Sequence, residues 1–341
     1  MSFLLLKTKN KEIGGNFMKK ISFILFILVS LFLFAWSGHE AFTYYLVQNL
    51  PNKDSLVKIT EYSYKEDRVY NEEYLVLEDV AGQRKFFEPL CDGKFPPDPS
   101  PVDNSLPVWQ ILTIYSPEPD NGMDEGLNLS PLQSLIGGGS QGVRHMKYKI
   151  GPLVAFEGDK SFLYFVDMSK KAFQSGDRYW GYRFLARALH YIEDLSQPYH
   201  NAPGLFGEVI WSALNKKMRT ILAYAHYFVD DYLVYLLYYS DNAAKEAILG
   251  AKPIFFDTYD EYVQNVMKYT LNKFPIVHNE VKRVFGEEGL LQRVTIDKMK
   301  TKDEEGEFYL LKAETLSILS YTSSVIKGFL EQFLKEVGEI N

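Results

Sequence analysis

The sequence predicts an all-α fold, organised as a single multi-helix domain. After Gly151, apolar residues recur at helical spacing in long segments that Gly, Pro and Asn residues separate. The alternation of strands and helices that α/β folds require does not occur in this pattern. The length of 341 residues allows one large domain or two small ones, and 46% hydrophobic with 24% charged residues exclude a disordered or collagen-like chain.

We expect a signal peptide over residues 1–35. Residues 21–35 form an uncharged apolar run directly after two lysines, which is the order of a secretory signal, and this run is short for a bilayer span. Cleavage after Ala35 would leave Trp36 as the N-terminus of an extracytoplasmic protein, secreted or periplasmic. An uncleaved membrane anchor is the alternative. Met18 is a candidate for the true start, since Met-Lys-Lys before the apolar run is itself a normal signal beginning.

The net charge and the number of cysteines limit the partners and the metal ligands that the chain can use. The net charge is −7, and removal of residues 1–35, with five Lys and one Glu, leaves −11 for residues 36–341. Such an acidic chain lacks the basic footprint of nucleic-acid-binding proteins, so no stable nucleic-acid complex is expected. The single cysteine, Cys91, excludes an internal disulfide and a multi-thiolate zinc site. Metal ligands in this chain would be nitrogen and oxygen atoms.

The expected elements follow in chain order. Residues 36–49 predict a short helix, and two alternating apolar runs within 56–87 predict a β-hairpin. Five prolines in the next stretch favour an extended loop over 93–107, so we expect an irregular or hairpin insertion at about 50–110. The later helices are predicted at about 157–175, 178–196, 205–240, 256–275 and 308–337.

A Gly-rich loop at 137–142 matches two short motifs. It fits the dinucleotide-binding pattern G-x-G-x-x-G and, read one residue on, the nucleophile elbow G-x-S-x-G with Ser140. Both motifs require a buried strand before the loop and a helix after it within an α/β sheet, which this sequence does not predict. A flexible turn is the favoured interpretation, and a serine hydrolase that uses Ser140 stays an alternative.

The segment HYIEDLSQPYH carries the first candidate metal ligands. His190 and Asp194 are four residues apart, so in a helix they share one face and can reach a common ion. Such a pair is usually a surface ion pair, but the neighbouring apolar residues predict burial, where an unpaired carboxylate is costly. Pro198 is expected to end the helix, so that His200 lies on the outgoing loop and points to a different ion.

The segment HYFVD repeats this spacing with His226 and Asp230, again among apolar residues. The chain contains only six histidines. His39 lies three residues after the expected mature N-terminus, and His145 follows the Gly-rich loop. His278 has no carboxylate in a matching pattern and is interpreted as a surface or capping residue.

These residues resemble the superfamily that joins bacterial zinc-dependent phospholipases C to the fungal-type single-strand-specific zinc nucleases. The resemblance rests on a Trp exposed by signal cleavage, on H-x3-D-x5-H with an internal Gln-Pro, and on a later H-x3-[DE]. It covers most of residues 36 to about 240. It implies a mostly helical fold of this type and a cluster of three zinc ions.

The resemblance also implies a ligand set. One ion would bind Asp120, His145, His190 and Asp194. A second would bind the free amine and carbonyl oxygen of Trp36, with His39 and the other oxygen of Asp194. The third would bind His200, His226 and Asp230. Family members place the aspartate of the first ion after a Pro or Ala, which favours Asp120, because it follows Pro119. Asp124 and Asp98 are the alternatives for this ligand.

Metal-assisted hydrolysis of a phosphodiester suits such ligands. Zinc ions about 3.5–4 Å apart activate a water molecule and stabilise the attacking and leaving oxygens of an in-line displacement. Asp120 is the candidate catalytic group that helps to deprotonate the water, and Arg144 is a candidate for contact with phosphate. Because only a true N-terminus can ligate metal through Trp36, an uncleaved precursor should be poorly active.

We expect an exported phospholipase C that cleaves glycerophospholipids to diacylglycerol and a phosphorylated headgroup, with transient contact to the membrane surface. The acidity of the chain argues against an extended track for nucleic acid. A single-strand-specific nuclease is the alternative, because aromatic rings that stack one or two bases suffice for it, and because Asp230 replaces the Glu usual in the lipases. A non-catalytic extracytoplasmic zinc-binding protein is the second alternative.

Overall fold

The computed structural model describes residues 38–64, 101–124, 127, 129 and 141–341. The remaining residues lie outside this description. Among them are the expected signal peptide with Met18 and Ala35, and also Trp36, Cys91, Asp98 and Ser140.

The described part of the chain is mostly helical, with 67% of its residues in helices, which confirms the all-α class. The α-helices are α2 (His39–Val47), α4 (Val108–Tyr115), α6 (Gln141–His145), α7 (Gly158–Gln174), α8 (Arg178–Asp194), α9 (Pro198–Asn201), α10 (Phe206–Ser212), α11 (Lys216–Val234), α12 (Ala243–Leu249), α13 (Tyr259–Gly289), α14 (Ile296–Glu304) and α15 (Tyr309–Glu336). A 3₁₀ turn, η2, spans Pro119–Asn121, and a π-helical turn, η3, spans Tyr235–Tyr239. Two short antiparallel pairs, β1 (Leu56–Lys58) with β2 (Ser105–Pro107) and β3 (Tyr148–Ile150) with β4 (Leu153–Ala155), complete the described elements.

Helix α8 is the central element of the fold. The Asp177 side chain accepts a hydrogen bond from the backbone nitrogen of Trp180 (3.3 Å) and so caps the first turn. Every residue from Tyr179 to Asp194 is buried, and helices α2, α4, α7 and α15 pack around α8. Gly181 allows α7 to approach, because a Cβ at this position would lie 2.8 Å from the ring of Phe173. Polar side chains on so buried a helix need partners inside the protein.

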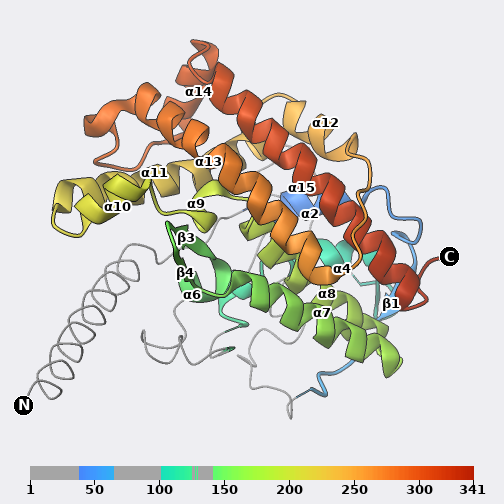
Figure 1. The fold of residues 1–341 in the computed structure, drawn as a ribbon. Coiled ribbons are helices and arrows are strands. Elements are labelled where there is room, and N and C mark those ends of the chain that lie inside the picture. The colour runs from blue at the N-terminus through green and yellow to red at the C-terminus, as the bar shows by residue number, and fades with distance from the viewer. Residues whose placement is uncertain (1–37, 65–100, 125–126, 128, 130–140) are drawn as a thin grey trace, which may run out of the picture.

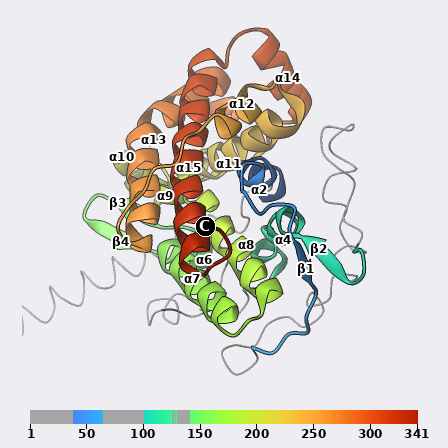
Figure 2. The same ribbon diagram turned by 90° about the vertical axis from the view of Figure 1, so that its right-hand side faces the viewer.

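Helices α13 and α15 pack along each other and cover one side of this centre (Figures 1 and 2). The sequence predicts a helix end at residue 275, but α13 continues through Pro275 as far as a kink at Gly286, where φ is +62°, and ends at Gly289. Pro275 lies on the exposed face of α13, where water can bond the carbonyl that the proline leaves free, while Phe274 and Val277 beside it are buried. The continuous buried face keeps the helix together across the proline.

Two other local expectations differ from the structure. The predicted helix over 205–240 is divided into α10, α11 and η3, because Asn215 caps a new start by accepting a hydrogen bond from the backbone nitrogen of Met218. In the expected insertion, β1 pairs with β2, and the second run of the expected hairpin lies outside the described residues. Within the described ranges, no helix is both long enough and apolar enough to cross a bilayer.

Candidate metal centre

Eight side chains expected as metal ligands come together around the end of α8. His39 comes from α2, Asp120 from η2 and His145 from α6, while the others lie on α8, α9 and α11. They form three groups in which the potential ligand atoms all lie within 4.8 Å of one another. The groups are His39 with His190 and Asp194, Asp120 with His145 and His190, and His200 with His226 and Asp230. Trp36, the remaining expected ligand, lies outside the described residues.

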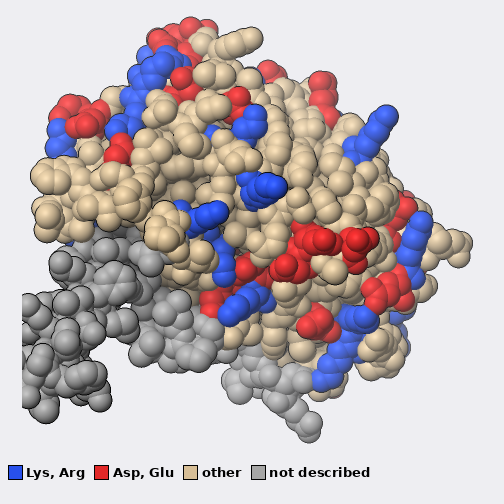
Figure 3. Space-filling view, in the orientation of Figure 1, with Lys and Arg blue, Asp and Glu red and all other residues tan. Residues whose placement is uncertain are grey.

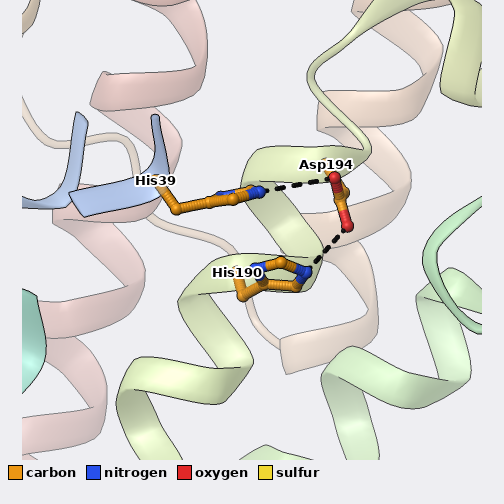
Figure 4. Close-up of side chains that lie close together, drawn as sticks. All are labelled: His39, His190 and Asp194. Carbon is orange, nitrogen blue, oxygen red and sulfur yellow. Dashed lines mark ion pairs between the residues drawn. The ribbon is translucent and has the colours of Figure 1, made fainter. Parts of the chain in front are cut away.

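Asp194 belongs to the group of His39 and His190, and it also lies close to one histidine of each of the other two groups. Its Oδ1 lies 3.5 Å from Nε2 of His39 and 3.2 Å from Nδ1 of His200. Its Oδ2 lies 3.1 Å from Nε2 of His190 and 2.9 Å from Nδ1 of His145. Figure 4 shows His39 from α2 and His190 from α8 approaching different oxygens of this carboxylate. The two oxygens of Asp194 therefore face different sets of imidazoles.

The separations suit metal ligands. Two atoms that each lie about 2.0–2.1 Å from one tetrahedral zinc ion are about 3.3 Å apart. Nε2 of His226 lies 3.3 Å from Oδ2 of Asp230, and Nε2 of His190 lies 3.5 Å from Oδ1 of Asp120. Neither ring nitrogen of His200 forms a hydrogen bond with the described residues, although both lie within 4 Å of a carboxylate oxygen. Buried polar atoms in this state are costly, and a divalent cation between them would remove that cost.

His39 is oriented by a carboxylate that the sequence analysis missed. Nδ1 of His39 lies 2.8 Å from Oε2 of Glu193, and the Thr43 hydroxyl donates to Oε1 of the same carboxylate (2.6 Å). This leaves Nε2 directed toward Asp194 and, at 3.9 Å, Asp120. A hydrogen bond at the second ring nitrogen is the usual way in which proteins fix a metal-binding histidine. The only local signal for Glu193 was its position beside Asp194 in a segment predicted to be buried.

His145 is oriented in the same way, by Asp124. Nε2 of His145 lies 3.0 Å from Oδ2 of Asp124, and Nδ1 lies 3.5 Å from Asp120. Asp124 also accepts two hydrogen bonds from Arg144 (2.6 and 2.8 Å) and one from Tyr191 (2.6 Å). Of the two described candidates for the first aspartate, only Asp120 faces both His145 and His190. Arg144, the candidate for contact with phosphate, is buried, and its guanidinium donates to Asp124.

Asp120 is held in place by a buried ion pair next to it in the chain. Glu118, which directly precedes η2, accepts hydrogen bonds from Nε of Arg183 (3.0 Å) and Nε of Arg187 (2.7 Å), one turn apart on α8. All three of these side chains are buried. The pairing joins η2 to the helix that carries His190. It was not expected from the sequence, because an isolated Glu in a turn has no pattern to indicate a buried partner.

Pro198 acts differently from the prediction. It begins the short helix α9 instead of leaving a loop, since proline is well suited to the first position of a helix. His200 therefore lies on a helical turn, with Nε2 3.7 Å from Oδ1 of Asp230. The Gln197 side chain joins the two segments, because its oxygen accepts from the backbone nitrogen of Tyr199 and its nitrogen donates to Asp230 (2.7 Å).

The interpretation of His278 as a surface or capping residue is wrong. The ring is buried in α13, Nδ1 lies 2.7 Å from the hydroxyl of Tyr199, and Nε2 lies 2.7 Å from Glu208. Tyr199 in turn stacks on His226, with ring centroids 5.8 Å apart. His278 thus holds Tyr199 in position, and Tyr199 packs against the metal-facing histidine His226. Its partners are distant in the sequence, so no local spacing could have indicated them.

Burial and mutual charge shift the proton affinities strongly. Burial would lower the pKa of His145, but the carboxylates of Asp124 and Asp194 raise it to about 10. Burial, reinforced by the neighbouring His190, lowers the pKa of His39 to about 3. Burial also raises the pKa of Asp230 to about 7. A metal ion bound by His145 would therefore have to displace the proton that this ring holds near neutral pH.

No protein-family model matches this chain, and no curated protein matches it in sequence. The candidate site is therefore defined by the geometry of this chain: a buried cluster of histidines and aspartates in an all-α fold, with groups close enough to hold metal ions.

Proposed function

We propose that the chain is a zinc-dependent phosphodiester hydrolase with a fold of the zinc phospholipase C and nuclease type. The observation that carries the proposal is the position of one carboxylate, Asp194, which belongs to the group of His39 and His190 and lies within 3.2 Å of a histidine of each of the other two groups. A single ion would need only one group. Three adjoining groups around one carboxylate support a multi-metal centre, which is the arrangement suited to phosphoryl chemistry.

The donor set favours zinc over other common ions. Five imidazoles and three carboxylates provide nitrogen and oxygen ligands without thiolate. Magnesium and calcium prefer oxygen ligands and water, whereas imidazole with carboxylate is typical of zinc. When bound, such ions supply Lewis acidity at phosphorus and a water nucleophile active near neutral pH.

The side chains themselves have distinct tasks. Glu193 and Asp124 orient His39 and His145 from behind, so the metal-facing nitrogens are fixed before substrate binds. Asp120 is the most exposed member of the three groups, with 19% of its side chain accessible, while the five histidines are fully buried. Substrate would therefore approach past Asp120, where this carboxylate can accept a proton from the attacking water.

A phospholipid is the favoured substrate, with cleavage to diacylglycerol and a phosphorylated headgroup. The net charge of −11 over residues 36–341 disfavours a polyanionic nucleic acid, whose affinity depends largely on basic side chains. A single-strand-specific nuclease is the second candidate, because Asp230 in the third group is the residue usual in those enzymes. The protein would act outside the cytoplasm.

The decisive experiment measures metal content and two hydrolytic activities of protein that begins at Trp36. We expect about three zinc ions per chain, and turnover of phosphatidylcholine that a chelator abolishes and zinc restores. Turnover of single-stranded DNA alone would select the nuclease. Metal binding without turnover of either substrate would leave a non-catalytic zinc protein, and chelator-resistant hydrolysis that Ser140→Ala abolishes would indicate a serine hydrolase.

Two neighbouring aspartates on α11 provide a matched pair of variants. Asp230 belongs to the third metal group, whereas the adjacent Asp231 forms an ion pair with Arg293 (2.6 Å) on the surface. Asp230→Asn should lose activity and metal, and Asp231→Asn should retain both. Equal behaviour of the two variants would contradict the proposed role of the third group.

A further inference from the structure

Helix α10 presents its apolar side chains to solvent. Four large apolar residues of α10 and the following turn are exposed: Phe206 (58%), Ile210 (44%), Trp211 (53%) and Leu214 (80%). Phe206 and Ile210 are four residues apart on one face of α10, and Leu214, in the turn after the helix, continues this spacing; we call these exposed residues the stripe. A surface helix normally turns such a stripe toward the core. In the region of α10, at the left of Figure 3, the surface is mostly uncharged.

The opposite face of α10 packs against the protein, and the acidic residue of the helix forms ion pairs away from the stripe. Val209 and Ser212 are buried against the protein. Glu208, the only acidic residue of α10, is bound by Nε2 of His278 (2.7 Å) and by Nζ of Lys282 (2.5 Å). The exposed stripe therefore carries no carboxylate and belongs to a well-anchored helix.

The β3–β4 hairpin extends this surface. The Phe206 ring packs against the turn at Gly151, where φ is +58° and a Cβ would lie 3.1 Å from the ring. Val154 on β4 is exposed by 58%. Val154 also borders a groove of about 430 Å³, with Lys149 and Lys268 among the residues that line it. Lys216, two residues after Leu214 at the start of α11, is a third exposed cation.

Helix α10 lies in the segment that connects α9 to α11, two helices that carry candidate metal ligands. His200 is on α9, directly before α10, and His226 is on α11, directly after it. A large body bound to α10 would thus meet the protein on the segment that joins two parts of the metal centre.

We propose that α10 and the β3–β4 hairpin form a docking surface for a lipid bilayer that contains anionic lipids, an inference that rests on the proposed function for its catalytic consequence only. We define this docking surface as Phe206, Ile210, Trp211, Leu214 and Val154, with Lys149, Lys216 and Lys268. Exposed Trp, Phe and Leu beside lysines are typical of interfacial helices, whose apolar face enters the headgroup region while cations meet anionic lipids. The three lysines of the docking surface favour an anionic bilayer, although the chain as a whole is acidic.

Vesicle sedimentation tests the proposal. The double variant Trp211→Ser, Leu214→Ser should bind vesicles of phosphatidylcholine with phosphatidylglycerol about tenfold or more weakly than the unchanged protein, because two large apolar side chains no longer enter the lipid. A matched control, Tyr309→Ser with Leu310→Ser, removes two apolar residues that are exposed at the start of α15, and it should bind as the unchanged protein does. Vesicles of phosphatidylcholine alone should bind more weakly than those with anionic lipid.

Two further measurements separate the outcomes. Hydrolysis of a short-chain, monomeric phosphatidylcholine should be equal in both variants and the unchanged protein, whereas hydrolysis of vesicles should fall only in the α10 variant. Equal vesicle binding by all three proteins, or no binding by the unchanged protein, would overturn the docking surface. So would sedimentation velocity that shows a dimer dispersed by the α10 substitutions, since a second copy would then occupy the stripe. Vesicle binding that only the α10 variant loses, without any turnover of monomeric phosphatidylcholine by the unchanged protein, would uphold the docking surface and reject the phospholipase activity.

Discussion

Replacement of Asp194 by asparagine tests the shared carboxylate most directly. The two side chains have the same shape, but the amide has only one acceptor oxygen. In the structure, Oδ1 faces His39 and His200 at 3.5 and 3.2 Å, and Oδ2 faces His145 and His190 at 2.9 and 3.1 Å. An amide nitrogen on either side cannot ligate a cation. The substitution therefore removes the carboxylate from at least one group, whichever way the amide turns.

The loss of these contacts sets the expected change in zinc content and in kcat/KM. We expect loss of at least one zinc ion per chain, and a fall in kcat/KM of about 100- to 1,000-fold or more, the cost typical of losing one preorganised electrostatic contact. Elemental analysis after gel filtration measures the ions, and hydrolysis of a monomeric phosphodiester measures the activity. Asp177→Asn is the control, because Asp177 caps the first turn of the same helix and has no part in the metal groups. An Asp194→Asn protein with unchanged zinc content and activity would refute the reasoning.

Three further predictions concern the groups around the ligands. Glu193→Ala should weaken zinc binding about 10- to 100-fold, measured by competition with a chelating dye, because His39 loses the carboxylate that orients it. Zinc affinity should rise with pH up to about 10, as followed by titration calorimetry, because His145, with its pKa raised to about 10 by Asp124 and Asp194, must release a proton before it binds metal. Gly158→Ala should lower the free energy of unfolding by about 1–3 kcal/mol, measured in urea, because its Cβ would lie 2.8 Å from the carbonyl oxygen of His145.

Each of these has a result that would contradict it. Unchanged zinc affinity in Glu193→Ala would mean that His39 needs no orienting partner. Zinc affinity independent of pH between neutral and alkaline solution would mean that no ligand proton is displaced. An unfolding free energy equal to that of the unchanged protein in Gly158→Ala would show that α7 can move away from His145 without cost.

The sequence was informative where the structure depends on local geometry. His190 with Asp194 and His226 with Asp230 could be paired from their spacing alone, because a helix places residues four apart on one face. The long helices were predicted for the same reason. Pro198 was interpreted wrongly because proline both ends a helix and suits the first position of the next, and only the backbone decides between these roles.

Contacts across long stretches of chain could not be predicted in this way. His39 meets Glu193, a residue 154 positions away, and Tyr199 meets His278 across 79 positions. Asp120 and Asp124 are distinguished by a distant partner as well, because Arg144 and one nitrogen of His145 bind Asp124, while Asp120 faces both His145 and His190. No periodic pattern in a single sequence contains these distances. The resemblance to a known family singled out the side chains that come together in the three groups, but not Glu193 or Asp124, which orient two of the histidines.

The shared position of Asp194 also has a mechanical consequence. A cation held between His39 and Asp194 would tie α2 to α8, and one held by His200 and His226 would tie α9 to α11. Closing a loop of more than 100 residues removes about 4–5 kcal/mol of entropy from the unfolded chain in the chain-entropy model. With one cysteine, the polypeptide has no internal disulfide for this purpose. Bound ions would then act as the cross-links that disulfides provide in other proteins. Removal of the ions by a chelator would make the chain more susceptible to proteolysis, as reduction does for a disulfide-linked protein.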